Sequence, residues 1–228
     1  MTNPRIRQSM PFIPDDELEQ RAYRMLSRWE ACEKSPLQPP VPVQLIAEVL
    51  LDLRFDWDVI ADTDATPILA YVNPATRTIK MNEARRSHFE TFFGTEAYTV
   101  AHEVAHWDLH VDASPYTQQS FSLEDEPKVQ VHMPLMHCER SSRDKQHDRY
   151  EIQADKYASY LLMPKHLLLA ALRGRDVCRW PTIYALRDMF EVSTTAMVKR
   201  LEALGLIYVA GGSIYPSKAH YDGQAALF

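Results

Sequence analysis

The sequence has few cysteines and no long apolar run. Its 228 residues include only Cys32, Cys138 and Cys178, and no two of them form a CxxC pair. This spacing argues against a disulfide framework and against a cysteine-based zinc site, and it is typical of reduced thiols. No segment approaches the roughly 18 uninterrupted apolar residues that a membrane helix requires. We therefore expect a protein that does not span a membrane.

An excess of basic residues is also missing. Lys and Arg number 25 against 31 Asp and Glu, which argues against the chain as a whole being a nucleic-acid binder. The charge is uneven, because residues 165–228 carry 8 Lys and Arg but only 5 Asp and Glu. Residues Met1–Arg5 lack the apolar segment that follows the basic residues of a signal peptide. We therefore expect no signal peptide and a cytoplasmic location.

What the sequence does contain is a mixture of helical and strand-like segments. Its content of 46% hydrophobic and 25% charged residues is typical of a globular protein. Helices are predicted from apolar periodicity over residues 14–33, 43–51, 95–110, 150–162, 165–172, 181–190 and 193–204. Strands are predicted over residues 55–60, 68–72 and 78–81, and a hairpin over residues 206–215. Residues 111–149 show no sustained periodicity and are predicted to form a long surface excursion.

The segment 98–110 contains the pattern His-Glu-x-x-His, formed by His102, Glu103 and His106. On an α-helix the two histidines are about 400° apart, so their rings project within about 40° of each other and can share one tetrahedral ion. Glu103 is rotated by about 100° from His102, which places its carboxylate beside a water on that ion without making it a ligand. The pattern predicts a metal helix with Glu103 as the catalytic base. The alternative is a helix with two solvated or core histidines.

A catalytic zinc site needs a third protein ligand and an open fourth position. We favour Glu151, because it shares the inward face of a predicted helix with Ala154 and Ala158; helix capping is the alternative. Asp155, one turn later, is placed to accept the ring N–H of a ligand histidine. The other downstream candidates are His110, His132, His137, Cys138 and His147. For His110 a supporting or surface role is favoured, because one helix rarely supplies three ligands to a tetrahedral ion.

A wider set of residues around these motifs carries a family resemblance, which spans about residues 43–207. Tyr98-Thr99-Val100-Ala101 precedes the first histidine, and Glu151-x-Gln153-Ala154-Asp155-x-Tyr157-Ala158 continues into Leu161-Leu162-Met163-Pro164. Together these motifs resemble the ImmA/IrrE family of zincin-like metallopeptidases. The resemblance implies a zincin fold, with zinc held by His102, His106 and Glu151. It also implies a helix-turn-helix repressor as partner, because members of that family are often encoded beside such repressors and cleave or inactivate some of them.

The C-terminal residues need separate consideration. Residues 183–204 are predicted to form two helices joined by a short turn, with Ser193 as the N-cap of the second, which is compatible with a helix-turn-helix. Lys199 and Arg200 are the candidate residues for contact with nucleic acid or a protein partner. Packing of the helix pair against the zincin body is favoured over DNA contact, because two basic residues are few for phosphate binding.

We therefore predict an α+β protein with a mostly helical zincin-like metallopeptidase fold, a small sheet and a C-terminal helix-turn-helix-like unit. The predicted parts are an N-terminal helix and linker (1–40), the zincin-like domain (41–175) and the C-terminal unit (176–228). The predicted function is Zn²⁺-dependent hydrolysis of peptide bonds in a specific intracellular protein, such as a phage or stress-response repressor. The alternative is a non-proteolytic regulatory protein that binds a repressor or DNA, including a toxin–antitoxin or phage-related component. No residue is assigned to oxyanion stabilisation, and the same ligands accept other divalent metals.

Overall fold

The computed structural model describes residues 13–61, 68–111 and 145–225. The candidates His132, His137 and Cys138 lie outside these residues, as does the side chain of His147. Within the described part of the chain, no helix combines the length and the apolar character that a membrane crossing requires.

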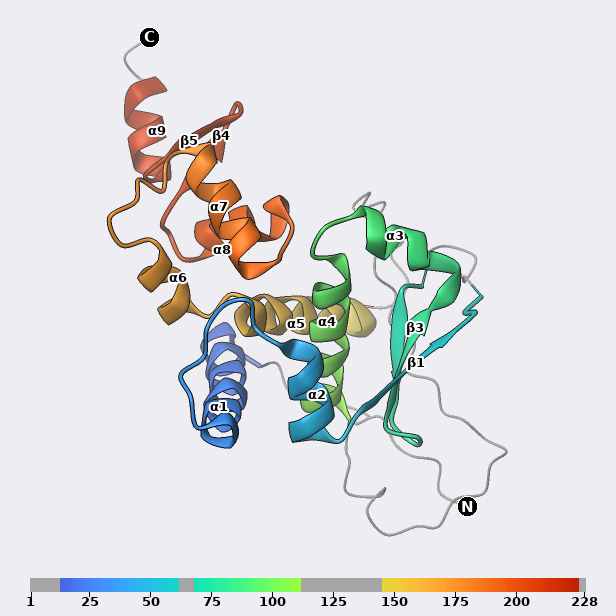
Figure 1. The fold of residues 1–228 in the computed structure, drawn as a ribbon. Helices are drawn as coiled ribbons and strands as arrows, with labels where there is room; N and C mark the ends of the chain where they lie inside the picture. Colours follow the sequence, from blue (N-terminus) through green and yellow to red (C-terminus); the bar gives the residue numbers. More distant parts are fainter. Residues whose placement is uncertain (1–12, 62–67, 112–144, 226–228) are drawn as a thin grey trace.

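The N-terminal helix α1 (Asp15–Glu33) begins with three acidic residues, which complement the positive end of the helix dipole. Its buried residues recur at helical spacing and are Leu18, Ala22, Met25, Leu26 and Trp29. The helix packs against α5 (Lys145–Leu162), and the shorter α2 (Val43–Leu51) packs against α4 (Thr95–His110). Both N-terminal helices therefore support the pair α4 and α5 from one side (Figure 1).

The predicted three-stranded sheet is present, and its last strand in sequence lies at its centre. The strands are β1 (Arg54–Asp58), β2 (Ala70–Asn73) and β3 (Thr78–Asn82), arranged in the order β1-β3-β2. β1 is parallel to β3, and β2 is antiparallel to it, with Val72 opposite Ile79. β2 packs against α4. The sheet is followed by the 3-10 turn η1 (Glu83–Arg85) and by α3 (Arg86–Thr91).

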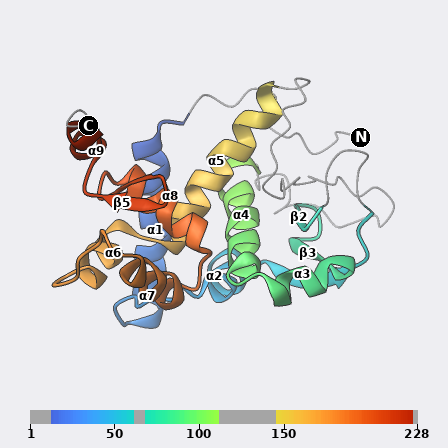
Figure 2. The same cartoon turned by 90° about the horizontal axis from the view of Figure 1, so that it is seen from above.

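Helix α4 lies at the centre of the molecule. Eleven of its sixteen residues are buried, as expected for a helix that is covered on all sides. Figures 1 and 2 show the sheet on one side of α4 and α5 on the other. Ala101 and Ala105 on α4, and Ala154 and Ala158 on α5, are fully buried, and small residues allow packed helices to approach closely.

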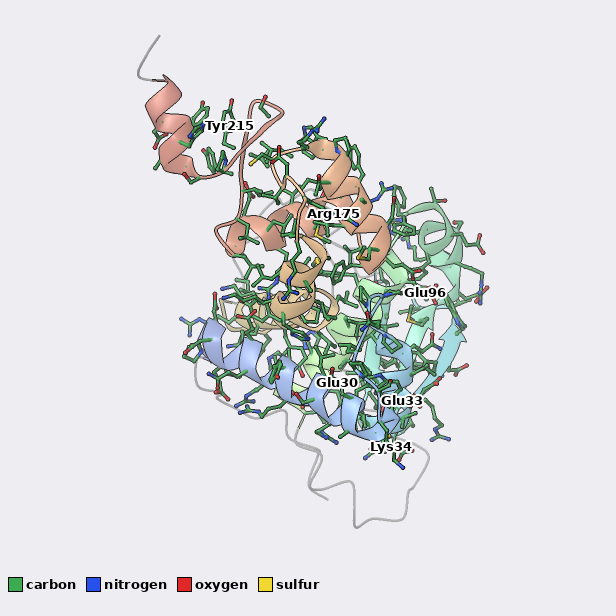
Figure 3. All side chains as sticks on the ribbon, turned by 60° about the vertical axis from the view of Figure 1, so that its left-hand side comes forward. Glu30, Glu33, Lys34, Glu96, Arg175 and Tyr215 are labelled. Atoms are coloured by element: carbon green, nitrogen blue, oxygen red, sulfur yellow. The ribbon has the colours of Figure 1, made fainter. Side chains whose placement is uncertain are left out.

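The C-terminal part contains α6 (Lys165–Ala171), α7 (Trp180–Phe190), α8 (Thr194–Ala203), the hairpin β4 (Tyr208–Ala210) and β5 (Ser213–Tyr215), and α9 (Lys218–Ala225). Ser193 caps α8 as predicted, because its Oγ accepts a hydrogen bond from the Ala196 N–H at 3.1 Å. Trp180 Nε1 donates to the Gly212 carbonyl oxygen at 2.9 Å and so ties α7 to the hairpin. In Figure 3, Arg175 and Tyr215 lie in this part of the molecule, far from Glu30 at the other end.

Two boundaries differ from the sequence-based expectation. Helix α5 begins at Lys145, so residues 145–149 belong to a helix and not to the predicted excursion. Their sequence, Lys-Gln-His-Asp-Arg, contains no apolar residue that could reveal helical periodicity. Helix α9 was also not predicted, because it is short and contains Gly223. One continuous core includes buried residues from Ile13 to Ile207, and the domain boundaries at residues 40 and 175 stay a prediction.

Candidate metal centre

Helices α4 and α5 bring three potential metal ligands together. The ligating atoms of His102, His106 and Glu151 all lie within 4.8 Å of one another. The Nε2 atoms of the two histidines are 3.0 Å apart. Glu151 Oε2 is 3.2 Å from His102 Nε2, and Glu151 Oε1 is 3.5 Å from His106 Nε2. A pair of histidines one turn apart on α4 and a glutamate on α5 therefore converge on one point.

The orientation of His102 is set by Asp155. Asp155 Oδ1 lies 3.0 Å from His102 Nδ1, and Tyr98 donates its hydroxyl hydrogen to the Asp155 carbonyl oxygen at 3.2 Å. Burial disfavours the charged form of His102, but hydrogen bonds to Asp155 and Glu151 outweigh it and raise its pKa to about 10. His102 Nε2 therefore carries a proton, and this atom faces the carboxylate of Glu151. A cation and this proton would compete for the same nitrogen.

His106 is held by a second, neutral set of side chains. Its Nδ1 lies 2.9 Å from His110 Nδ1, and His110 Nε2 lies 3.2 Å from Gln153 Oε1. Burial lowers the pKa of His106, and it lowers the pKa of His110 to about 4. His110 is therefore uncharged. It contacts the His106 ring at Nδ1, the nitrogen that does not face Glu151. Sequence reasoning missed a role for Gln153, although this residue stands in the motif that carries the family resemblance.

Glu103 is buried beside the ligands, with a side chain whose hydrogen bonding is incomplete. The residue is 1% exposed, and its carboxylate accepts a hydrogen bond from the Val72 N–H of β2. Its Oε2 has no hydrogen-bond partner among the described residues. Burial raises the pKa of Glu103 to about 8, with His102 opposing the shift and Glu151 adding to it. Buried polar atoms are normally satisfied, so the free oxygen of Glu103 is available to a ligand.

The three converging side chains fit a divalent cation. In a tetrahedral site with metal–ligand distances of about 2.0–2.1 Å, ligand atoms are about 3.3 Å apart. The distances between the ligating atoms here, 3.0, 3.2 and 3.5 Å, scatter around that value. Two imidazole nitrogens and one carboxylate, with a fourth position left to solvent or substrate, are also the ligand set of catalytic zinc sites. The same donors accept other divalent metals.

A further contact ties the two ligand helices together. Tyr157 on α5 is fully buried, and its hydroxyl donates to Asp108 Oδ2 on α4 at 2.9 Å. Tyr98 on α4 donates in the opposite direction, to Asp155 on α5. The register of the helices, and hence the spacing of the ligands, is therefore fixed at two places.

The candidate contact residues of the C-terminal unit have different surroundings. Lys199 is exposed, and its role stays a prediction. Arg200 is only 3% exposed: its Nε donates to the Met163 carbonyl oxygen at 3.1 Å, and its guanidinium group pairs with Glu19. The hydrogen bonds of Arg200 are directed into the protein, which favours packing of this side chain, and its role as a contact residue stays a prediction.

A buried His-Glu-x-x-His helix faced by a glutamate from a second helix defines a zincin-like metal site. Residues 94–202 match the family model described as Peptidase_M78, the IrrE N-terminal-like domain. This match confirms the resemblance to ImmA/IrrE proteins over residues 94–202 and supports the zincin-like fold.

A solved structure described as a Mycobacterium tuberculosis transcriptional regulator is similar, with 18% sequence identity and a TM-score of 0.46. The similarity covers 84% of this chain and 47% of that structure, so the chain spans about half of its length. No curated protein matches the chain.

Proposed function

We propose that the protein is a zinc-dependent peptidase, with His102, His106 and Glu151 as the metal ligands and Glu103 as the general base. The family and the convergence of the three ligands support metal-dependent peptidase chemistry. One observation supports the role of Glu103 most directly. Its Oε2 is buried next to the ligands and has no hydrogen-bond partner among the described residues, so it is free to accept a proton from water.

The proposed chemistry is hydrolysis of a peptide bond. A bound Zn²⁺ ion lowers the pKa of a water molecule to about 7 and polarises a carbonyl group. Glu103 takes the proton from the attacking water and returns it to the leaving amine nitrogen. Burial raises the pKa of Glu103 in the metal-free protein, and a cation held beside it would lower that pKa again, which favours the form that accepts a proton.

Asp155 would position His102 as a metal ligand. Asp155 accepts the Nδ1 hydrogen of His102, which orients the ring and makes Nε2 a better ligand. The Tyr98 hydroxyl donates to the Asp155 backbone and limits the movement of that residue. Asp155 therefore acts on the reaction through His102 and not on the substrate.

The proposed substrate is a specific intracellular protein, with a helix-turn-helix repressor as the first choice. This choice follows from the family resemblance, and it fits a cytoplasmic location.

We also propose that residues 176–228 form the separate C-terminal unit and that residues 1–40 form the N-terminal helix and linker, around a metallopeptidase domain over residues 41–175.

A non-proteolytic regulatory protein is the second candidate function. It is favoured by the N-capped helix α8, which leaves Lys199 exposed on a two-helix unit. An activity of this kind would survive replacement of Glu103 and would depend on Lys199. The burial of Arg200 leaves α8 with few positive charges for DNA.

Glu103→Gln tests the proposed function. The amide has nearly the same size but cannot take up the proton, so we expect the variant to keep its zinc and to hydrolyse peptides at least about 10²-fold more slowly. Hydrolysis is measured with a library of quenched fluorescent peptides and with a purified helix-turn-helix repressor. Glu96→Gln, an exposed carboxylate on the same helix, is the matched control. Unchanged hydrolysis by Glu103→Gln would refute the role of Glu103 as the base.

A further inference from the structure

Two buried polar side chains behind the metal ligands have no role in the chemistry above. His110 on α4 and Gln153 on α5 are each 6% exposed, and they contact each other at 3.2 Å. Burial of polar groups costs free energy unless they are hydrogen-bonded. Neither residue belongs to the cluster of possible metal ligands in the described part of the chain. Their position therefore calls for an explanation other than metal binding.

The hydrogen bonds of this pair determine which nitrogen of each ring carries a hydrogen. A neutral imidazole has one N–H and one acceptor nitrogen. Gln153 Oε1 can only accept, so the His110 Nε2 atom facing it must donate. His110 Nδ1 is then an acceptor, and the His106 Nδ1 atom 2.9 Å away must be the donor. This leaves His106 Nε2 with a free lone pair that faces His102 and Glu151.

We propose that His110 and Gln153 form a two-step hydrogen-bond relay that positions His106 as a metal ligand. The relay holds the His106 ring in the form protonated on Nδ1 and directs Nε2 to the site. His110 is a positioning residue in this scheme and not a ligand. The inference rests on the proposed metal-dependent function and names two residues through which that site is built.

The relay also connects the ligands on the two helices. Gln153 follows Glu151 by two residues on α5, whereas His106 and His110 are one turn apart on α4. The hydrogen bond from His110 to Gln153 therefore fixes His106 relative to the helix that carries Glu151. His102 achieves the same with a different partner, because its Nδ1 meets the carboxylate of Asp155. One histidine is thus supported by a charged group and the other by a neutral chain.

Two substitutions of His110 separate positioning from packing. In His110→Asn, the amide oxygen takes the place of the Nδ1 acceptor, whereas His110→Leu fills a similar volume without any acceptor. We expect zinc and cobalt affinities, measured by competition with a chromophoric chelator, to fall about 10–100-fold in His110→Leu. In His110→Asn the loss is less than about tenfold, because the acceptor is kept. If the residue only fills space, the leucine variant binds metal at least as well as the asparagine variant, and the inference is overturned.

Gln153→Met tests the second step of the relay. Methionine has a volume close to that of glutamine but cannot accept a strong hydrogen bond, so the His110 ring is free to turn over. We expect a smaller loss of affinity than in His110→Leu, and a visible spectrum of the cobalt form that keeps the shape of the wild-type spectrum. A changed cobalt spectrum in both His110 variants would instead make His110 a ligand and would also overturn the inference.

A measurement on the metal-free protein distinguishes failure of the relay from failure of the proposed function. Long-range ¹H–¹⁵N correlation spectra report which nitrogen of each histidine is protonated. We expect His106 to be protonated on Nδ1 in the wild-type protein and to show a mixture of both forms in His110→Leu. Protonation of wild-type His106 on Nε2 would rule out the relay. The expected protonation together with no metal binding would leave the relay intact and refute the metal-dependent function.

Discussion

The helix pair α4–α5 and the helix pair α7–α8 bury ionisable groups in opposite ways. In α7–α8 the inner face is apolar apart from Arg200, and the hydrogen-bonding and charged partners of Arg200 are supplied by the protein itself, through Met163 and Glu19. In α4–α5, Glu103 is buried with one oxygen that no described residue reaches. Burial of a charged group with partners is compatible with a structural role, whereas an unsatisfied one calls for a ligand. The comparison therefore distinguishes a candidate ligand site in α4–α5 from a structural helix pair in α7–α8.

The largest expected effect is loss of the metal from α4–α5 alone. His106→Ala removes a ligand, so we expect elemental analysis to find no bound zinc, and peptide hydrolysis to be abolished. Lys199→Ala, an exposed change on α8, is expected to leave the zinc content and hydrolysis at wild-type levels. Zinc retained by the His106 variant would remove the distinction between the two helix pairs.

The two regions meet at Gly94, the N-cap of α4. Its φ is 78°, and a Cβ at this position would lie 2.7 Å from Val192 and 2.8 Å from the Glu191 carbonyl oxygen, in the turn between α7 and α8. We expect Gly94→Ala to destabilise the protein by about 3 kcal/mol, since left-handed strain of about 1 kcal/mol adds to overpacking of about 1–3 kcal/mol. Denaturant unfolding measures this change in the free energy of unfolding.

A matched glycine provides the control for this contact. Gly174 also has a positive φ, 73°, but a Cβ there would meet nothing within 4 Å. Gly174→Ala should therefore show only the backbone strain, about 1 kcal/mol. Equal losses in the two variants would mean that the contact between the α7–α8 turn and the metal helix contributes nothing to stability.

Replacement of Arg200 tests whether its buried contacts stabilise the protein. Arg200→Ala leaves the buried Met163 carbonyl oxygen and the Glu19 carboxylate without their donor, so we expect a loss of about 2 kcal/mol in the free energy of unfolding. Lys199→Ala changes an exposed neighbour and should stay within about 0.5 kcal/mol of wild type. Unchanged stability of Arg200→Ala would show that these contacts contribute little.

The sequence predicted those features that follow from local periodicity. The helix around His102 and His106, the three strands and the N-cap Ser193 all depend on spacing within a few residues. Glu151 could be selected because the apolar stripe of its helix indicated which way it faces. The proximity of Glu151 to the histidine pair in space agrees with that selection.

The remaining features depend on contacts that no local pattern encodes. His110 and Gln153 are neutral side chains 43 residues apart, so neither charge nor periodicity links them. The partners of Arg200 are Met163 and Glu19, which lie far from it in the sequence. The spacing of three residues between Arg200 and Met197, which is buried, places both on the inner face of α8, and that spacing was the available signal.

The smallest expected effect comes from the tie between the ligand helices. Tyr157→Phe removes the hydroxyl that donates to Asp108 and leaves the ring in the core, so we expect a loss of about 1 kcal/mol in the free energy of unfolding. Tyr23→Phe, an exposed tyrosine, is the control and should be neutral. Because Tyr157 fixes the register of α4 and α5, zinc affinity should fall together with stability. A loss of stability with unchanged zinc affinity would show that the ligands hold their spacing without this hydrogen bond.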